Sequence, residues 1–177
     1  MAGIPYTICF VRRGDDVLML LRDRPPNAGL WNGLGGKISP GETPVECARR
    51  EVREEAGIDL GPEDLRFRGT VRWSAGVDPT GPSTGMYAFV AELPDGSPPG
   101  DEVRISEGLL AWKPLAWVCD PANGAVVGNI PRLLPDFLGG GEPAEYRCEY
   151  VDGVLVGVSV GRLQNRVALT AGIMRVR

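Results

Sequence analysis

The stretch that decides the fold is GKISPGETPVECARREVREEAGI, residues 36–58. A glycine-containing loop leads here into a short helix whose start is well marked. Thr43 is a favourable N-cap, Pro44 suits the first helical position, and Glu46 completes a T-x-x-E capping box. A glycine at the far end can take the left-handed conformation that closes a helix. We therefore predict a helix over residues 44–56. The apolar residues near helical spacing form its buried stripe, namely Val45, Ala48, Val52 and Ala56.

Three carboxylates share one face of this helix. Glu51, Glu54 and Glu55 stand at i, i+3 and i+4, so they lie side by side. They sit near the helix C-terminus, where the helix dipole opposes each charge by roughly 0.3 kcal/mol or more and where they repel one another. Such a face can be an ordinary solvated surface. A divalent cation would resolve the conflict, because hard cations take several oxygen ligands. Arg50 can brace the same face, with Glu42 as its partner from the loop.

The same stretch resembles the Nudix box, G-x5-E-x7-R-E-U-x-E-E-x-G-U, in which U is aliphatic. The residues that fill its fixed positions are Gly36, Glu42, Arg50, Glu51, Val52, Glu54, Glu55, Gly57 and Ile58. The resemblance implies an α+β protein with the Nudix α/β/α sandwich, a mixed β-sheet and the Nudix loop-helix, in a single domain over residues 1–161. It also implies Mg²⁺-dependent hydrolysis of a nucleoside diphosphate linked to another group, with Mn²⁺ as a substitute. The metal ligands implied within this stretch and beside it are the carbonyl of Gly35 and the carboxylates of Glu51, Glu54 and Glu55.

Length and charge limit the classes of protein to consider. A chain of 177 residues suits one domain that buries about two-thirds of its unfolded surface. Its formal net charge of −4 argues against polymeric nucleic acid as a partner, because such binding needs a basic face. The acidic balance suits a site in which cations meet the phosphates of a nucleotide. No run approaches 18 apolar residues, so we expect no membrane span. Both a monomer and a homodimer fit the sequence.

The absence of histidine and the scatter of the cysteines narrow the chemistry further. Without histidine the chain lacks the commonest general base, the usual zinc ligand, and Ser-His or Cys-His catalysis. Proton transfer must then come from a carboxylate, a lysine or metal-bound water. The cysteines show no C-x-x-C spacing and are interpreted as reduced thiols. Because the N-terminus also lacks a signal-peptide pattern, we expect a cytoplasmic protein. The four cysteines are Cys9, Cys47, Cys119 and Cys148.

Hydrophobic alternation predicts the other elements. The strands are expected at residues 5–12, 16–21, 65–74, 86–93 and 109–112. A turn or one-turn helix is expected at 114–118, and a helix at 129–138. A hairpin joins 146–151 to 154–160 around Asp152-Gly153, a favourable two-residue turn. Residues 75–84 and 94–101 are expected to be loops. No role is assigned to residues 162–177.

The segment before the box extends the resemblance. Residues 28–42, AGLWNGLGGKISPGE, are similar to MutT-type enzymes that hydrolyse oxidised purine nucleoside triphosphates, the 8-oxo-dGTP diphosphatases. Asn32 stands where that family uses an amide to read the base edge, and its alternative role is a loop-stabilising Asx turn. The positions that resemble the pocket wall and floor are Tyr6, Thr7 and Trp73, the last of which also suits a core tryptophan. Arg22 and Lys37 fall where basic residues lie near the phosphates, or they are solvated surface charges.

One acidic residue outside the box also matches the resemblance. Glu107 resembles a carboxylate that approaches the metals as a ligand or base, with Glu92 and Glu102 as competitors. The sequence departs from the family at its Trp-x-Asp-Asp segment, which helps to recognise the oxidised base. The region here is roughly residues 119–124, and Asp120 or Asn129 are the substitutes to consider. Selection of an 8-oxo base is therefore left open.

The expected reaction follows from the resemblance. It is hydrolysis of a (d)NTP to the monophosphate and pyrophosphate, with 8-oxo-dGTP as the example and nucleotide pool sanitation, a form of DNA repair, as the purpose. Glu54 is the first choice as essential ligand, while the base is left open among Glu51, Glu55 and Glu107. The alternatives are hydrolysis of a plain dNTP, ADP-ribose, a dinucleoside polyphosphate or a capped RNA end, or a sensor that binds a nucleotide without cleaving it.

Overall fold

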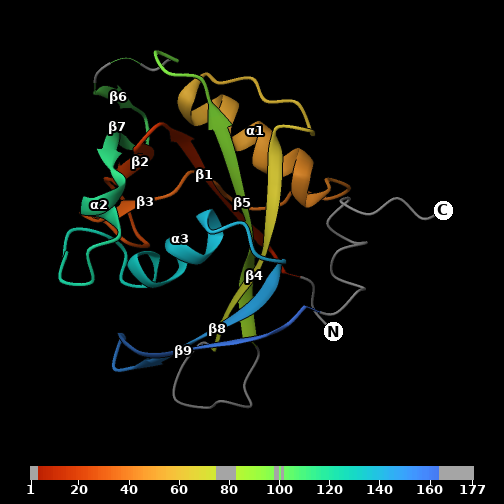
Figure 1. The fold of residues 1–177 in the computed structure, drawn as a ribbon, viewed down its shortest axis with the longest axis vertical. Helices are drawn as coiled ribbons and strands as arrows, with labels where there is room; N and C mark the ends of the chain where they lie inside the picture. The colour runs from red at the N-terminus through yellow and green to blue at the C-terminus, as the bar shows by residue number, and fades with distance from the viewer. Residues whose placement is uncertain (1–3, 75–82, 98–99, 101, 164–177) are drawn as a thin grey trace.

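The computed structural model describes residues 4–74, 83–97, 100 and 102–163 (Figure 1). In this part of the chain the strands form one sheet in the order β6-β7-β2-β1-β5-β4-β8-β9, with β3 paired to β2. The strands are β1 (Tyr6–Arg13), β2 (Asp16–Arg22), β3 (Trp31–Asn32), β4 (Leu65–Ser74), β5 (Ser83–Leu93), β6 (Val103–Ile105), β7 (Gly108–Pro114), β8 (Ala144–Val151) and β9 (Val154–Arg162). The helices are α1 (Pro44–Ala56), α2 (Leu115–Val118) and α3 (Ile130–Leu138).

The sheet is mixed and is covered on both faces. β1 runs parallel to β5 and β4 parallel to β8, whereas the other pairs are antiparallel. Successive side chains of a strand point to opposite faces. In β1, Ile8 and Phe10 pack in the cluster that contains α3, and Cys9 and Val11 pack in the cluster that contains α1. The two helices therefore lie on different sides of the sheet (Figure 1), and the predicted α/β/α sandwich is confirmed.

Most predicted elements are confirmed, and two short strands were missed. The helix over 44–56 and the hairpin around Asp152 and Gly153 have the predicted bounds to within a few residues. β3 and β6 were not predicted, because strands of two and three residues carry too little alternation to detect. The expected loop over 75–84 is partly wrong, since Ser83 already belongs to β5, and its residues 75–82 lie outside the described chain. Of the expected tail 162–177, residues 164–177 also lie outside it.

The glycine-rich loop lies in the plane of the sheet. β1 and β2 pair only near their connecting turn, through Arg12 with Val17 and Arg13 with Asp16. Farther along, the segment from Trp31 to Lys37 fills the space between them. β3 pairs with β2, and Leu34 exchanges backbone hydrogen bonds of 2.7 and 3.1 Å with Cys9 of β1. The loop is thus held by two strands before it enters α1.

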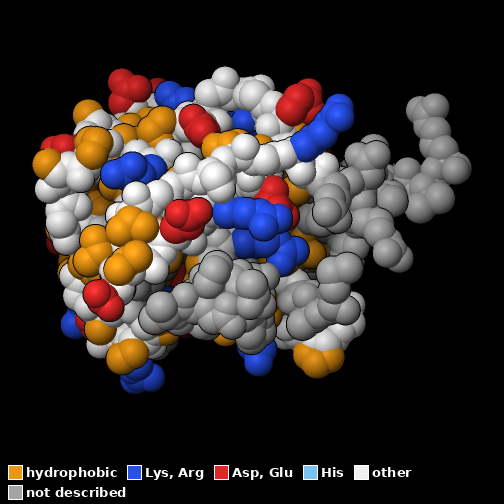
Figure 2. Space-filling view, turned by 90° about the horizontal axis from the view of Figure 1, so that it is seen from below, with side chains coloured by type: hydrophobic (Ala, Val, Ile, Leu, Met, Phe, Trp, Pro, Cys, Tyr) orange, Lys and Arg blue, Asp and Glu red, His pale blue; other side chains and the backbone are white. Residues whose placement is uncertain are grey.

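The C-terminal hairpin extends the sheet beside β4. Glu145 of β8 forms ion pairs with Arg72 of β4 at 3.3 Å and with Arg147 at 2.6 Å. Basic and acidic side chains lie next to one another on the face at this end of the molecule (Figure 2). No helix among the described residues has both the length and the apolar character needed to cross a membrane.

Candidate active site

Helix α1 is fixed at both ends and along its buried face. Glu46 N–H donates to Thr43 Oγ1 at 3.3 Å, and Thr43 N–H donates back to Glu46 Oε2 at 2.8 Å, which is the predicted capping box. At the other end Gly57 has a φ of 69°, and its N–H donates to the Arg53 carbonyl at 3.0 Å. Val52 is fully buried against the sheet. The helix therefore presents its carboxylates at fixed positions.

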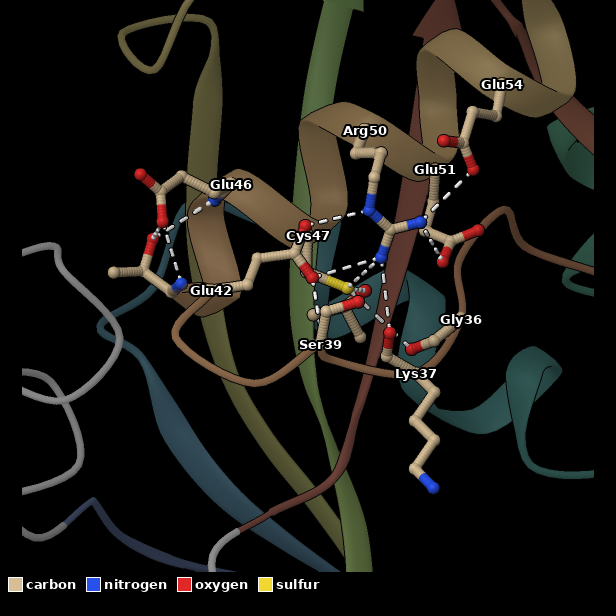
Figure 3. Close-up of polar contacts among 11 residues, drawn as sticks. Gly36, Lys37, Ser39, Glu42, Glu46, Cys47, Arg50, Glu51 and Glu54 are labelled. Carbon is tan, nitrogen blue, oxygen red and sulfur yellow. Dashed lines mark hydrogen bonds and ion pairs between the residues drawn. The ribbon is translucent and has the colours of Figure 1, made fainter.

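Arg50 connects the helix carboxylates to the loop (Figure 3). Its Nε and Nη2 donate to the two oxygens of Glu42 at 2.8 and 3.0 Å. Its Nη1 donates to Glu51 Oε1 at 2.8 Å and to Glu54 Oε2 at 3.1 Å. Its Nη2 also donates to the Lys37 carbonyl at 3.2 Å. The hydrogen bonds from Arg50 hold the pKa of the Glu42 carboxyl below its usual range. One guanidinium thus orients two helix carboxylates and ties them to the loop.

Glu55 is the most buried of the three helix carboxylates, with 5% of its surface exposed. Its Oε2 accepts a hydrogen bond from Gly35 N–H at 2.9 Å, while its Oε1 is buried with no hydrogen-bond partner. Burial raises the pKa of Glu55 to about 8 against the effect of the Gly35 hydrogen bond, and the carboxylates of Glu107 and Glu51 add to the rise. A buried acceptor without a partner is costly, so this oxygen calls for a cation or a donor.

Two glycines of the loop are required by close approaches. A Cβ atom on Gly36 would lie 2.3 Å from Glu51 Oε1. Gly35 has a φ of 145°, and a Cβ there would lie 2.2 Å from the Thr7 carbonyl oxygen. Both distances are far too short for real contacts. A side chain at residue 35 would meet backbone, whereas one at residue 36 would push the Glu51 carboxylate aside, so glycine at both positions lets the loop pass between β1 and the carboxylates.

Glu107 joins the carboxylates from outside the helix. It immediately precedes β7, whose Gly108 pairs with Arg22 at the end of β2. Arg22 Nη1 lies 3.9 Å from Glu107 Oε2. The Glu107 charge raises the pKa of both Glu51 and Glu55, which places it within electrostatic reach of them. Its competitors are engaged elsewhere: Glu92 pairs with Arg66, and Glu102 with Lys113.

The carboxylates offer oxygen ligands suited to a hard divalent cation, but they do not converge closely enough to surround an ion. Among the described residues, no three acidic or thiol side chains meet closely enough to hold a metal ion as they stand. Glu51 and Glu54 share Arg50, and Glu55 bonds to the loop. The all-oxygen chemistry and the unpartnered Glu55 Oε1 nevertheless fit Mg²⁺ or Mn²⁺.

The structure spreads the predicted base-binding residues over several places. Asn32 Oδ1 accepts a hydrogen bond from Gly33 N–H at 3.0 Å, within its own loop. Thr7 points to α1, where its Oγ1 lies 3.3 Å from Cys47 Sγ. Tyr6 is 41% exposed, and Trp73 packs partly buried against the cluster around α3. None of these four side chains lines either of the two hollows described below.

Asp120 and Asn129, the substitutes considered for the divergent segment, also lie in different surroundings. Asp120 is exposed, and its Oδ1 accepts a hydrogen bond from Ala122 N–H at 2.9 Å, so it stabilises its own turn. Asn129 is 6% exposed and lines a cavity between the sheet and α3. The Lys37 side chain points away from the Arg50 network (Figure 3).

Two hollows lie near these residues, and sequence reasoning predicted neither. The cavity under α3 measures about 10 Å³, room for about one water molecule. Its lining residues are Ile8, Phe10, Val71, Met86, Asn129, Ile130, Leu133 and Phe137. A groove of about 280 Å³ lies beside Glu107. Its lining residues are Arg22, Arg24, Pro25, Ser106 and Glu107.

Fold and site together define a class of protein, a hydrolase domain with its carboxylates on a loop-helix. The family model described as "NUDIX domain" matches residues 4–134. The chain therefore belongs to the Nudix hydrolase family, as the resemblance of its box predicted.

Individual proteins that are similar to this chain are consistent with this family assignment. A human protein named 8-oxo-dGDP phosphatase NUDT18 is 33% identical over 129 residues, which are 72% of this chain and 37% of that protein. A Haemophilus influenzae protein named NAD-capped RNA hydrolase NudC is 34% identical over 151 residues, 82% of this chain and 51% of that protein. The chain spans about half or less of the length of these curated relatives. Among solved structures, a MutT protein from Bacillus halodurans superposes with a TM-score of 0.66 at 22% identity, covering 88% of this chain and 95% of that one, which shows the shared fold.

Proposed function

We propose that the chain is a Mg²⁺-dependent pyrophosphohydrolase that converts a nucleoside triphosphate and water into a monophosphate and pyrophosphate. The observation that carries the proposal is the buried Glu55 Oε1, which has no hydrogen-bond partner and lies within electrostatic reach of the carboxylates of Glu51 and Glu107. Glu51, Glu54, Glu55 and Glu107 would hold the ion, together with the Gly35 carbonyl. When bound, Mg²⁺ neutralises phosphate charge and lowers the pKa of a water molecule.

The protein's own residues prepare this site in three ways. Arg50 orients Glu51 and Glu54 through hydrogen bonds of 2.8 and 3.1 Å. The Gly35 N–H orients Glu55 from the loop. Glu54 has 56% of its side chain exposed and can therefore reach an ion at the open side. Such fixed positions reduce the reorganisation needed during the reaction.

Oxidised purines such as 8-oxo-dGTP are the first candidate substrates, which would make the enzyme part of nucleotide pool sanitation in the cytoplasm. The loop segment around Asn32 and the relative named 8-oxo-dGDP phosphatase support this choice. The second candidate is another nucleotide diphosphate, such as an NAD-linked RNA end, ADP-ribose or a dinucleoside polyphosphate. Relatives named NAD-capped RNA hydrolases favour that alternative.

A nucleotide panel tests the proposal. Purified protein is assayed with Mg²⁺, and separately with Mn²⁺, on 8-oxo-dGTP, dGTP, dATP, CTP, ADP-ribose, NAD and diadenosine tetraphosphate. Released pyrophosphate and phosphate are measured together with the nucleotide product. Preferential turnover of 8-oxo-dGTP supports sanitation, whereas an equal rate on all triphosphates removes it. Absence of any turnover with either ion contradicts the catalytic proposal.

A further inference from the structure

The groove beside Glu107 differs in chemistry from the cavity under α3. Apart from Pro25, its lining side chains are charged or polar: two arginines, a serine and a glutamate. Pockets for whole drug-sized ligands usually measure roughly 300 Å³ or more. At about 280 Å³, this groove suits one part of a substrate rather than an entire nucleotide.

The two arginines of the groove have different surroundings. Arg22 lies 3.9 Å from the Glu107 carboxylate, and its Nε donates to the Pro26 carbonyl at 3.0 Å, so it is held in place. Arg24 is exposed and has no hydrogen bond or ion pair among the described residues. Its free guanidinium offers a fork of N–H donors that matches phosphate oxygens. Ser106 adds a hydroxyl donor.

The groove shares one residue, Glu107, with the carboxylate site. Glu107 belongs to both, since it lines the groove and acts electrostatically on Glu51 and Glu55. Its own charge would repel an anion, but the adjacent Arg22 offsets that charge. A phosphate chain that reaches the helix carboxylates can therefore continue past Glu107 toward Arg24.

We propose that this groove binds the terminal phosphate of a nucleoside triphosphate and that Arg24 recognises it. The inference rests on the proposed function and narrows its substrate class. None of the five lining residues is aromatic, so the groove offers no ring on which a second base could stack. A free phosphate end fits it better than the second nucleoside of a dinucleotide.

Steady-state kinetics of Arg24→Gln test the assignment. The substrates are dGTP, dGDP and NAD, assayed with Mg²⁺. The control is Arg132→Gln, which removes an exposed arginine of α3 that has no side-chain partner among the described residues. Loss of one charge-assisted hydrogen bond should raise KM for dGTP roughly tenfold. The kinetics on dGDP should stay unchanged, the wild-type protein should prefer dGTP to NAD, and the control should behave as wild type.

A binding measurement separates this inference from the proposed function. Inorganic tripolyphosphate with Mg²⁺ is titrated calorimetrically into the wild type and both variants, and Arg24→Gln should bind about tenfold more weakly. If the wild type cleaves no nucleotide but shows this loss, the groove assignment stands and the proposed function fails. If dGTP is cleaved and Arg24→Gln matches the control in both measurements, the groove assignment is overturned. Equal losses on dGTP and dGDP, or a wild-type preference for NAD, overturn it as well.

Discussion

The candidate sites on the two faces of the sheet differ in how many of their side chains are already held in position and in how much open space they offer. On the α1 face, Arg50 and the Gly35 N–H already hold the carboxylates, and Glu107, which acts on them electrostatically, also lines a groove of about 280 Å³. On the α3 face, the cavity has room for about one water molecule, and Asn129 is its one polar lining residue among those described. For the proposed phosphate chemistry the carboxylates would still have to close around an ion, whereas a base that entered the α3 cavity would have to displace side chains. Changes on the first face should alter rate, and changes on the second should alter the choice of base.

The largest expected effect comes from removing a charge on the α1 face. Glu54→Gln should lower kcat at least ~10²-fold, because it removes a strong electrostatic element while keeping side-chain shape. Pyrophosphate release measures the rate, and circular dichroism measures folding. The matched control is Glu142→Gln, an exposed loop glutamate far from the Arg50 contacts in sequence. Near-normal turnover by a folded Glu54→Gln protein would remove Glu54 from the chemistry.

A pH effect on stability should follow from Glu55. Its folded-state pKa of about 8 lies above the ordinary 4.5, so the folded state binds more protons between these values. Its contribution is therefore fully present below about pH 4.5 and is lost as pH rises through about 8. With chelator present, the free energy of unfolding should fall by on the order of 4 kcal/mol between pH 5 and 9. Urea unfolding of the wild type and Glu55→Gln checks this, and the variant should lose most of that slope. An equal slope in both proteins contradicts the burial argument.

A smaller loss is expected from crowding the loop against the helix. In Gly36→Ala the new methyl group would lie 2.3 Å from Glu51 Oε1, so Glu51 must shift away from Arg50. We expect kcat to fall roughly 20-fold, because misplacing one oriented carboxylate weakens charge stabilisation. The control is Gly124→Ala, whose added Cβ would meet nothing within 4 Å. Unchanged kcat in Gly36→Ala would show that the position of Glu51 does not limit the reaction.

The two faces also differ in what could be predicted from the sequence. The α1 site depends on local signals: a cap, a fixed glutamate spacing and a closing glycine, all within residues 36–58. The groove depends on pairing between β2 and β7, which brings Arg24 and Ser106 together from segments about 80 residues apart. No local pattern contains such a contact. β3, in which Trp31 pairs with Leu21, escaped prediction for a different reason, because a strand of two residues carries too little alternation to detect.

After residue 118 the sequence departs from the family pattern, and the local sequence does not decide which residue replaces the missing acids. Sequence alone left Asp120 and Asn129 as equal substitutes for the missing acids. The structure separates them, because the carboxylate of Asp120 accepts the Ala122 N–H in a turn, while Asn129 begins α3 above the cavity. Which polar group faces a cavity is decided by helix packing, and that packing is not encoded in the spacing of the two residues.

The smallest expected effect tests the α3 face through Asn129. An amide can pair with both a donor and an acceptor on a purine edge, and leucine of similar size cannot. Asn129→Leu should change the ratio of kcat/KM for 8-oxo-dGTP over dGTP about fivefold, while kcat on dGTP stays near the wild-type value. Thermal unfolding checks that the buried substitution is tolerated. Asp120→Ala serves as the matched control and should leave the ratio unchanged, because its carboxylate is used within its own turn. If Asp120→Ala shifts the ratio and Asn129→Leu does not, base selection lies outside the α3 cavity. The assignment of rate to the α1 face and of base selection to the α3 face would then be wrong.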